Sequence, residues 1–379
     1  MEIKSRGNEA GAELRRTPLY RQHLRLGARM APFGGFEMPI QYRGIVEEHQ
    51  AARRQAALFD TCHMGEFHLS GTTAVADLQR LLTCQVETLP VGRCRYGLLC
   101  NEAGGVIDDL LLYRLATDEF MLVGNSARRQ PDWLWLRRHV GRQTRLLDQS
   151  EEIAKIDLQG PAAVPIAIRL MGEPIDNMVF YSFRKNRYRD REILLSRTGY
   201  TGEIGFEFYL PVDLAEPLWN DCLELGAAPA GLGARDTLRL EMGMPLHGHE
   251  LSENRVAGEA GLGRAIAADK KFVGSDKVHD KSLLKQSLQG ILLTDRRAAR
   301  QGQTVLRAED EREIGTVTSG SFAPSLGRAV ALAYLDRETA KVGDRILVAA
   351  GRRRLEGQVV EPPFYRKATG RAKLARFMP

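Results

Sequence analysis

The chain has 379 residues, a formal net charge of +6, 43% hydrophobic residues and 27% charged residues. This length predicts two or three domains with ample cores, and the composition is typical of a soluble globular protein. The charged start lacks an apolar stretch, which argues against secretion. No apolar run reaches the roughly 18 to 20 residues that cross a membrane, which argues against membrane insertion. The arginines are scattered, which argues against nucleic-acid binding.

The first half of the chain mixes predicted helices and strands. Apolar residues at helical spacing predict three helices, at 44–60, 72–83 and 131–140. Alternation of apolar and polar residues predicts two strands, at 64–71 and 118–125. This mixture indicates α/β domains in this half of the chain.

Between these two strands, the segment RCRYGLLCNEAGGVIDDLLLYRL predicts a hairpin, with Gly104 and Gly105 in its turn. Strand alternation places Asp108 on the face of Val106, Leu110, Leu112 and Arg114. It places Asp109 on the opposite face, with Ile107, Leu111, Tyr113 and Leu115. Asp108 can pair locally with Arg114, whereas Asp109 has no charge partner on its strand.

Burying an unpaired carboxylate costs several kcal/mol, so the position of Asp109 needs an explanation. One explanation is function, because a carboxylate on an apolar face can meet a ligand. The other is structure, because backbone N–H groups or a distant arginine can satisfy the carboxylate. Asp109 is therefore a candidate catalytic residue, with both explanations open.

A second hairpin is predicted over 191–211, and helices follow at 213–225 and 234–243. Glu207 shares a strand face with Gly205 and Tyr209, opposite three apolar side chains. A carboxylate accepts two parallel hydrogen bonds, so it suits a flat ligand edge that carries an N–H beside an NH₂. A rim carboxylate that faces water is the alternative.

The composition changes near residues 270–286, and six short strands follow. Their motifs are LQGILLTD, TVLRAED, EIGTVTSG, RAVALAYLD, DRILVAA and LEGQVVE. Many short strands separated by turn residues predict a small β-barrel or jelly-roll module of about 90 residues.

Other common motifs are missing or weak. The glycines of GYTGEIG follow a strand but do not open a helix, so they do not form a phosphate cradle. The pairs His247/His249 and His63/His68 are not joined by a convergent set of carboxylates or thiols, so no metal is expected. Five cysteines without a CxxC favour reduced thiols and a cytoplasmic location.

Six segments together resemble one family closely, the aminomethyltransferases or T proteins of the glycine cleavage system. The segments are TPLYRQHLRLGARMAPFGGFEMPIQY, LFDTCHMGEFHLSG, NEAGGVIDDLLLYRL, SRTGYTGEIGFE, GLGARDTLRLEMGMPLHGHEL and IGTVTSGSFAPSLGRAVALAYL. They occur in the family's order and span nearly the whole chain. This resemblance is more specific than any single motif.

The resemblance implies an α+β fold with three domains in a cloverleaf. Two mixed α/β folate-binding domains would comprise residues 1–64 with 151–243, and residues 65–150 with 244–283. The second of them would carry the catalytic aspartate. Residues 284–379 would form the C-terminal barrel or jelly-roll-like domain.

The resemblance also implies site residues. The family's catalytic aspartate falls on Asp109, its pterin-binding acid on Glu207, and an arginine that meets the benzoyl or glutamate end of folate on Arg235. The remaining expected folate contacts fall on Met64, Tyr96, Tyr113, Tyr181 and Tyr200. We expect these eight residues to form one site.

The implied activity transfers the methylene carbon of an aminomethyl group to tetrahydrofolate, giving 5,10-methylenetetrahydrofolate and ammonia. The donor would be the lipoylated H protein, and the enzyme would act as a monomer without metal or flavin. Two alternatives keep the folate site: a demethylase of another one-carbon donor, and a non-catalytic maintenance protein. The maintenance proteins carry a K-G-C-Y-x-G-Q-E signature that this chain lacks.

The chain departs from the family's usual pattern at several places. Phe36 and Arg264 stand where tryptophan is common, and His247 stands where tyrosine is common. The tail PPFYRKATGRAKLARFMP is also unusual, so no functional residue is assigned there.

Overall fold

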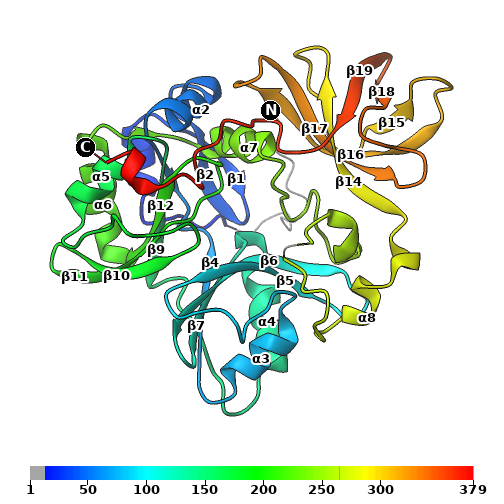
Figure 1. Cartoon of the computed structure of the whole chain (residues 1–379). Helices are drawn as coiled ribbons and strands as arrows, with labels where there is room; N and C mark the ends of the chain where they lie inside the picture. The colour runs from blue at the N-terminus through cyan, green and yellow to red at the C-terminus, as the bar shows by residue number, and fades with distance from the viewer. Residues whose placement is uncertain (1–12, 264, 379) are drawn as a thin grey trace.

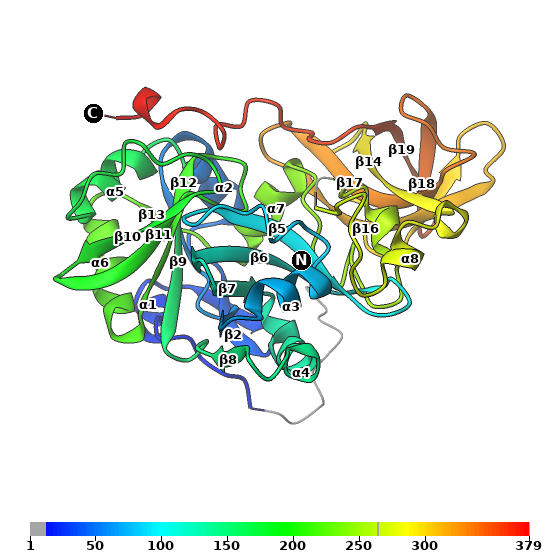
Figure 2. The ribbon, with the colours of Figure 1, turned by 60° about the horizontal axis from the view of Figure 1, so that its bottom comes forward.

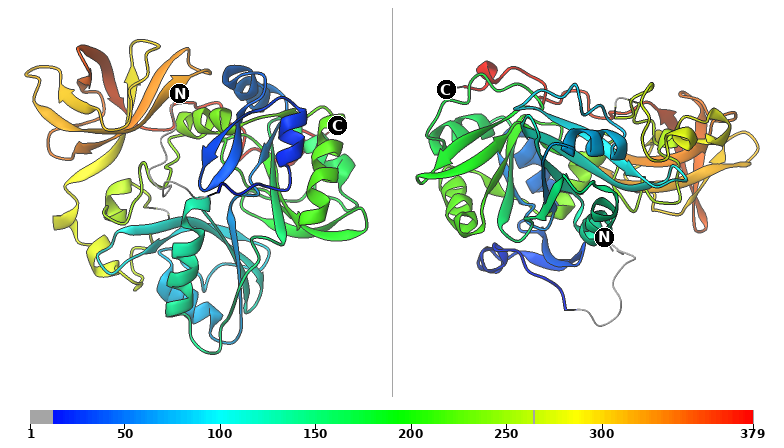
Figure 3. Two further views of the ribbon diagram at one scale, coloured as in Figure 1. Left: turned by 180° about the vertical axis from the view of Figure 1, so that it is seen from behind. Right: turned by 90° about the horizontal axis from the view of Figure 1, so that it is seen from below.

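The computed structural model describes residues 13–263 and 265–378, so Arg264 and most of the charged N-terminal segment lie outside the described residues. Its strands form three lobes that meet in the middle of the molecule (Figure 1). The same three lobes are seen from behind in Figure 3. The predicted α+β class, with a C-terminal barrel, is confirmed.

The first lobe is built on a six-stranded sheet in the order β10-β11-β12-β9-β3-β13. Its strands are β3 (Ala57–Asp60), β9 (Ile153–Gln159), β10 (Phe183–Tyr188), β11 (Arg191–Ser196), β12 (Gly205–Pro211) and β13 (Ala228–Pro229). Helices α5 (Ala163–Leu170) and α6 (Ala215–Glu224) cover one face. Trp219 of α6 packs there with apolar side chains of β9 and β12, such as Ile156 and Phe208.

Smaller elements complete this lobe. They are α1 (Tyr20–Arg25), α2 (Ile45–Arg54) and the hairpin of β1 (Arg29–Phe33) with β2 (Phe36–Gln41). The predicted helix over 44–60 is therefore too long, because its last residues form β3. All four residues of β3 are buried, and a short, fully buried apolar run has no period that separates strand from helix.

The second lobe is a five-stranded sheet in the order β5-β6-β7-β4-β8, covered by two helices. The strands are β4 (Gly65–Ser70), β5 (Cys94–Cys100), β6 (Val106–Ala116), β7 (Glu119–Gly124) and β8 (Arg145–Asp148). The helices are α3 (Ala74–Leu81) and α4 (Arg129–His139). The predicted hairpin is confirmed, because β5 pairs with β6 in antiparallel register.

A β-bulge changes the faces of β6 near its start. Leu99 pairs with Asp108 while Cys100 pairs with Val106, so Ile107 is the extra residue. Ile107 packs in the core under α3 and α4 rather than on the face of Asp109, so strict alternation placed it wrongly. Beyond the bulge alternation holds, and Tyr113 stays on the predicted face, away from that core.

The third lobe is a closed six-stranded barrel, which confirms the barrel and removes the jelly-roll alternative. Its strands are β14 (Gln286–Leu293), β15 (Thr304–Arg307), β16 (Glu313–Ala323), β17 (Arg328–Asp336), β18 (Arg345–Ala350) and β19 (Arg353–Val360). Small side chains such as Ala331 and Ala333 fill its interior together with Ile291 and Val348.

Helix α7 (Leu232–Glu241) lies between the lobes and contacts α2, β2 and β16. After it, residues 242–285 return to the second lobe and contain α8 (Ser275–Val278). The short 3₁₀ helices are η1 (Ser126–Arg128), η2 (Val212–Leu214), η3 (Ala257–Ala260), η4 (Lys281–Leu283) and η5 (Leu374–Arg376). In residues 13–263 and 265–378, no helix has the length and apolar character needed to cross a membrane.

Candidate functional site

The open faces of the two sheets meet in a mixed apolar and polar layer. Tyr113 of β6 and Tyr209 of β12 lie in it with their ring centroids 5.5 Å apart. Met64 and Tyr181 pack at its margin and are only partly buried. Several of the predicted site residues therefore come together between the two lobes.

On the first-lobe side of this layer, four charged side chains form a continuous series of ion pairs. Lys155 donates to Glu207 Oε1 at 2.8 Å and to Asp157 Oδ1 at 2.6 Å. Arg235 Nη1 donates to Asp157 Oδ2 at 2.9 Å. Burial lowers the pKa of Lys155, but Asp157 and Glu207 raise it more, and the net shift is upward. The ammonium group therefore stays charged between its two carboxylates.

Glu207 is enclosed on its other side by hydroxyl groups. Thr198 donates to its Oε2, and the hydroxyls of Tyr113 and Tyr209 lie 3.4 Å from the same oxygen. Glu207 is only 3% exposed, so the prediction of a rim acid in water is wrong. The three hydroxyl contacts use the acceptor capacity of Oε2, whereas Oε1 accepts from Lys155 and keeps one lone pair free.

Asp109 lies on the second-lobe side and is partly exposed. Its Oδ2 accepts from the Tyr96 hydroxyl at 2.9 Å, and its Oδ1 accepts from Asn125 Nδ2 at 2.9 Å. No cation bonds to it among the described residues. Burial and the charge of Asp108 raise the pKa of Asp109 to about 7, so it titrates near neutral pH.

Asp108 differs from the expectation of a local pair with Arg114. It is fully buried and accepts from the backbone N–H and the side-chain amide of Asn125, both at 2.8 Å. Arg114 instead donates to the carbonyls of Leu89 and Thr117, both at 2.8 Å. The reason is the register of the sheet, which turns Asp108 toward α4 beneath the end of β7.

A third carboxyl group lies beside this pair. A methyl group on Gly124 would lie 2.9 Å from Asp108 Oδ2 and 3.0 Å from Asp132 Oδ2, so the two acids flank this glycine. Burial and the charge of Asp108 raise the pKa of Asp132 well above its ordinary value. Asn125 thus connects a buried acid cluster to the partly exposed carboxylate of Asp109.

Two loops bring the remaining tyrosines to the site. The Tyr200 ring lies beneath the guanidinium of Arg235, 4.9 Å from its centroid, and its hydroxyl donates to the Pro245 carbonyl. Tyr181 has a φ of +62°, which a bulky residue rarely adopts. Burial raises the pKa of Tyr96 and Asp109 adds to the shift, with smaller contributions from Tyr200 and Tyr181.

Sequence reasoning missed Lys155, Asp157 and Asn125. The first two had a signal, because the segment IAKIDLQ alternates polar and apolar residues in a strand that is buried almost throughout. A lysine and an aspartate on one buried face require partners on another strand. Asn125 had no such signal, since asparagine after a strand is an ordinary turn residue.

The histidine pairs make separate contacts. His247 and His249 bond to the carbonyls of Val106 and Thr318, at 3.2 and 3.1 Å, and His68 bonds to Glu119 at 2.8 Å. Burial lowers the pKa of His63 to about 4, so its ring is neutral. Within the described part of the chain, no three His, Cys, Asp or Glu side chains gather as metal ligands would.

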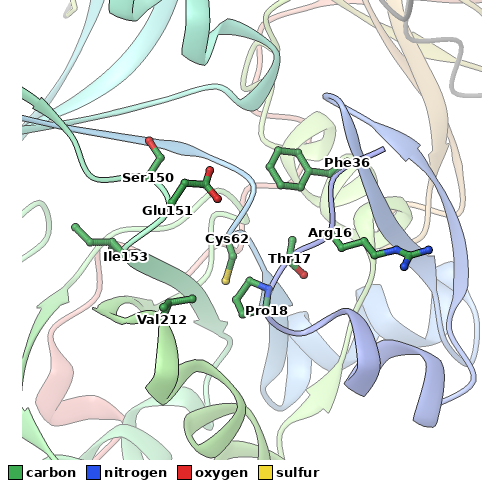
Figure 4. A pocket seen from close by; sticks show the side chains of 9 residues that line it. All are labelled: Arg16, Thr17, Pro18, Phe36, Cys62, Ser150, Glu151, Ile153 and Val212. Carbon is green, nitrogen blue, oxygen red and sulfur yellow. The ribbon is translucent and has the colours of Figure 1, made fainter. Parts of the chain in front are cut away.

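A separate small pocket of about 180 Å³ lies near the N-terminal segment, and Figure 4 shows its lining. Cys62, Glu151 and Phe36 contribute to its wall. None of the eight predicted site residues lines it, although Ile153 of its wall also packs against the layer between the sheets.

The layer between the sheets therefore has two chemically different ends. One end offers a carboxylate whose pKa lies near neutrality, beside a phenol and an amide. The other end offers the acceptor carboxylate of Glu207, the cations Lys155 and Arg235, and aromatic faces. This arrangement suits a flat ligand that presents N–H donors to Glu207 and an anionic group to the nearby Arg235.

Two family models match the chain. A family model described as the GCVT N-terminal domain matches residues 19–270. A second model, the glycine cleavage T-protein C-terminal barrel domain, matches residues 287–366. Together the two models account for most of the chain.

Individual relatives match over nearly their whole length. An aminomethyltransferase of Symbiobacterium thermophilum is 44% identical over 369 residues, which cover 93% of this chain and 98% of the relative. One from Herpetosiphon aurantiacus is 40% identical over 357 residues, covering 93% and 99%. The crystal structure of the glycine cleavage system aminomethyltransferase T from Bartonella henselae superposes with a TM-score of 0.87 at 31% identity, covering 94% of this chain and 99% of that one.

Proposed function

This chain belongs to the glycine cleavage T-protein family, and from that premise we propose that it is a tetrahydrofolate-dependent aminomethyltransferase. Its donor would be the aminomethyl group carried on the dihydrolipoyl arm of H protein. The observation that carries the proposal is the carboxylate of Asp109, which faces the layer between the sheets and bonds to no cation in residues 13–263 and 265–378.

The proposed reaction moves one methylene carbon from sulfur to two nitrogens. Its bonds to the lipoyl sulfur and to the amino nitrogen break, and bonds to N5 and N10 of tetrahydrofolate form. The protons displaced from N5 and N10 leave on ammonia and on the dihydrolipoyl thiol, so atoms and charges balance. The protein's main task is to position the reactants and to limit water.

Asp109 is the proposed catalytic residue. Its ionised form would orient the folate near N10 and stabilise positive charge that develops at the aminomethyl group. A carboxylate in a site of low dielectric does this better than one in water. Tyr96 and Asn125 hold the two oxygens in place, and both contacts leave lone pairs free toward the ligand.

The remaining site residues are proposed to bind the folate. Glu207 would accept from the N3–H and 2-amino edge of the pterin, and Arg235 would meet the benzoyl or glutamate end. Met64, Tyr96, Tyr181 and Tyr200 would pack against the rings, since each is partly exposed at the layer. Tyr113 is fully buried, so we assign it to the support of Glu207.

One experiment tests the proposal directly. The protein is mixed with aminomethyl-loaded H protein, and ammonia release is measured with and without tetrahydrofolate. We expect release that depends on both the loaded H protein and the folate. Ammonia release that folate does not stimulate would contradict the proposal, and folate-dependent demethylation of another donor would favour the demethylase alternative.

We also propose the domain division expected from the sequence, with boundaries near residues 64, 150, 243 and 283. The membership of the strands in two separate sheets and a barrel supports it. The five cysteines are free and buried, which fits a reducing compartment such as the cytoplasm. Light scattering coupled to gel filtration would test the proposed monomer.

A further inference from the structure

The C-terminal tail crosses the molecule from the barrel back to the first lobe. Figure 2 shows it in red, running from β19 over the edge of the first-lobe sheet toward α5. The family's barrel model ends at residue 366, but the tail continues to make contacts well past that point. We call residues 367–378 the C-terminal strap.

The strap binds the loop that carries Tyr200. Gly370 N–H donates to the Gly202 carbonyl at 2.8 Å, and Ile204 N–H donates to Thr369 Oγ1 at 3.0 Å. Thr369 also donates through its hydroxyl and its backbone N–H to Glu203. Three consecutive residues of the loop are thus bonded to two residues of the strap.

The strap also binds the turn that carries Tyr181. Arg197 connects the two, because its guanidinium donates to the Ala372 carbonyl of the strap and to the Met178 carbonyl of the turn, the latter at 2.6 Å. The Arg197 carbonyl accepts from Tyr181 N–H at 3.1 Å. Arg371 of the strap lies over the ring of Phe180, 5.6 Å from its centroid.

The strap is anchored at its far end by apolar contacts. Leu374 is 2% exposed and belongs to the core of the first lobe, and Phe377 packs against the same core. These contacts keep the strap in place, so its hydrogen bonds to the two loops are made by a fixed element. Both loops lack regular secondary structure and depend on such bonds for their conformation.

We propose that the C-terminal strap is a positioning element that holds the Tyr181 turn and the Tyr200 loop in the conformation that binds the folate. The inference rests on the proposed function, since it assigns a purpose to the two tyrosines. It also explains the left-handed backbone of Tyr181, because a bulky residue keeps a positive φ only where its surroundings hold it.

Thr369 offers the sharpest test in the full-length protein. Thr369→Val removes the hydroxyl at nearly constant shape, whereas Thr369→Ser keeps it. We expect Thr369→Val to raise the Kd and KM for tetrahydrofolate by about fivefold with kcat little changed, and Thr369→Ser to restore both. Lys373→Ala is the matched control, because Lys373 is an exposed residue of the same strap.

Three outcomes separate the possibilities. Equal folate affinity in Thr369→Val and Lys373→Ala would overturn the strap proposal while leaving the proposed function intact. A lower kcat at unchanged KM would also overturn it, since that is the pattern of a smaller folded fraction. If the unaltered protein does not bind tetrahydrofolate, the proposed function fails.

Hydrogen exchange gives a readout that does not depend on the folate. We expect faster amide exchange over residues 178–182 and 199–204 in Thr369→Val than in Thr369→Ser or Lys373→Ala. Unchanged exchange in both segments would show that the strap does not hold them.

Discussion

Two adjacent aspartates on β6 have the same side chain but differ in burial and in hydrogen bonding. Asp108 is enclosed and receives two hydrogen bonds from Asn125, so its acceptors are used inside the protein. Asp109 receives one bond each from Tyr96 and Asn125 and is partly exposed to the layer between the sheets. Only Asp109 is therefore able to meet a ligand.

Replacing Asp109 by asparagine removes the negative charge of the side chain and keeps its shape nearly constant. We expect Asp109→Asn to lose at least about tenfold in kcat, because the charge that stabilises the transition state is removed. Folate affinity, measured by equilibrium binding, should change little. Asp118→Asn, in an exposed turn, is the control, and full activity in Asp109→Asn would make Asp109 structural.

The titration of Asp109 should appear in the pH dependence of the reaction. Its pKa is raised to about 7, and the role proposed for it requires the ionised form, so kcat/KM should fall as the pH decreases through this value and reach a plateau above it. This decrease of kcat/KM at low pH should disappear in Asp109→Asn. A wild-type profile that is flat between about pH 6 and 8 would contradict the assignment.

At the scale of elements, β9 shows how one strand serves both a core and a site. Its apolar residues Ala154, Ile156 and Leu158 pack under α5 and α6. Its polar residues Lys155 and Asp157 face the layer and bond to β12 and α7. The strand therefore connects packing in the first lobe to the charges of the site.

Two cross-strand lysine–glutamate pairs of the first lobe allow a matched comparison. Lys155–Glu207 is buried at 2.8 Å, and Lys185–Glu192 is exposed at 2.9 Å. Lys155→Met leaves the buried Glu207 without its cation and Asp157 with Arg235 alone, so it should destabilise the fold by about 3–5 kcal/mol. Lys185→Met should cost under about 1 kcal/mol, measured by urea unfolding. Equal losses of unfolding free energy in Lys155→Met and Lys185→Met would contradict the assigned burial of the Lys155 network.

At the scale of the whole molecule, Arg53 joins the lobes. It donates to Glu203 of the Tyr200 loop at 2.9 Å and to Glu241 of α7 at 2.8 Å. It also reaches Ser325 between barrel strands β16 and β17, at 3.3 Å. One buried guanidinium thus bonds to the first lobe, the central helix and the barrel.

Arg53→Met should therefore weaken the assembly of the lobes. Glu203 and Glu241 would lose their buried cation, and we expect a destabilisation of about 3–5 kcal/mol in urea unfolding. The neighbouring Arg54 is exposed, so Arg54→Met should stay within about 0.5 kcal/mol of the unaltered protein. Similar stabilities for the two variants would show that the bonds of Arg53 do not hold the lobes together.

Much of the architecture could be predicted from the sequence, and the failures have local causes. The β5–β6 hairpin, the strands β4 and β7 and the barrel follow from alternation and turn residues, whereas the short β8 was not predicted. The strand β3 was read as the end of a helix because four buried residues carry no period. Ile107 was put on the wrong face because a bulge adds one residue that alternation cannot anticipate.

The sequence by itself determined that Asp109 and Glu207 are acids on strands rich in apolar residues, because the two-residue period of a strand is a local property. Only the tertiary structure decided which groups neutralise the buried charges. Lys155 meets Glu207 across 52 positions, and Arg235 meets Asp157 across 78. A local pattern records that a side chain is buried, but its partner depends on how distant strands, loops and the C-terminal strap pack together.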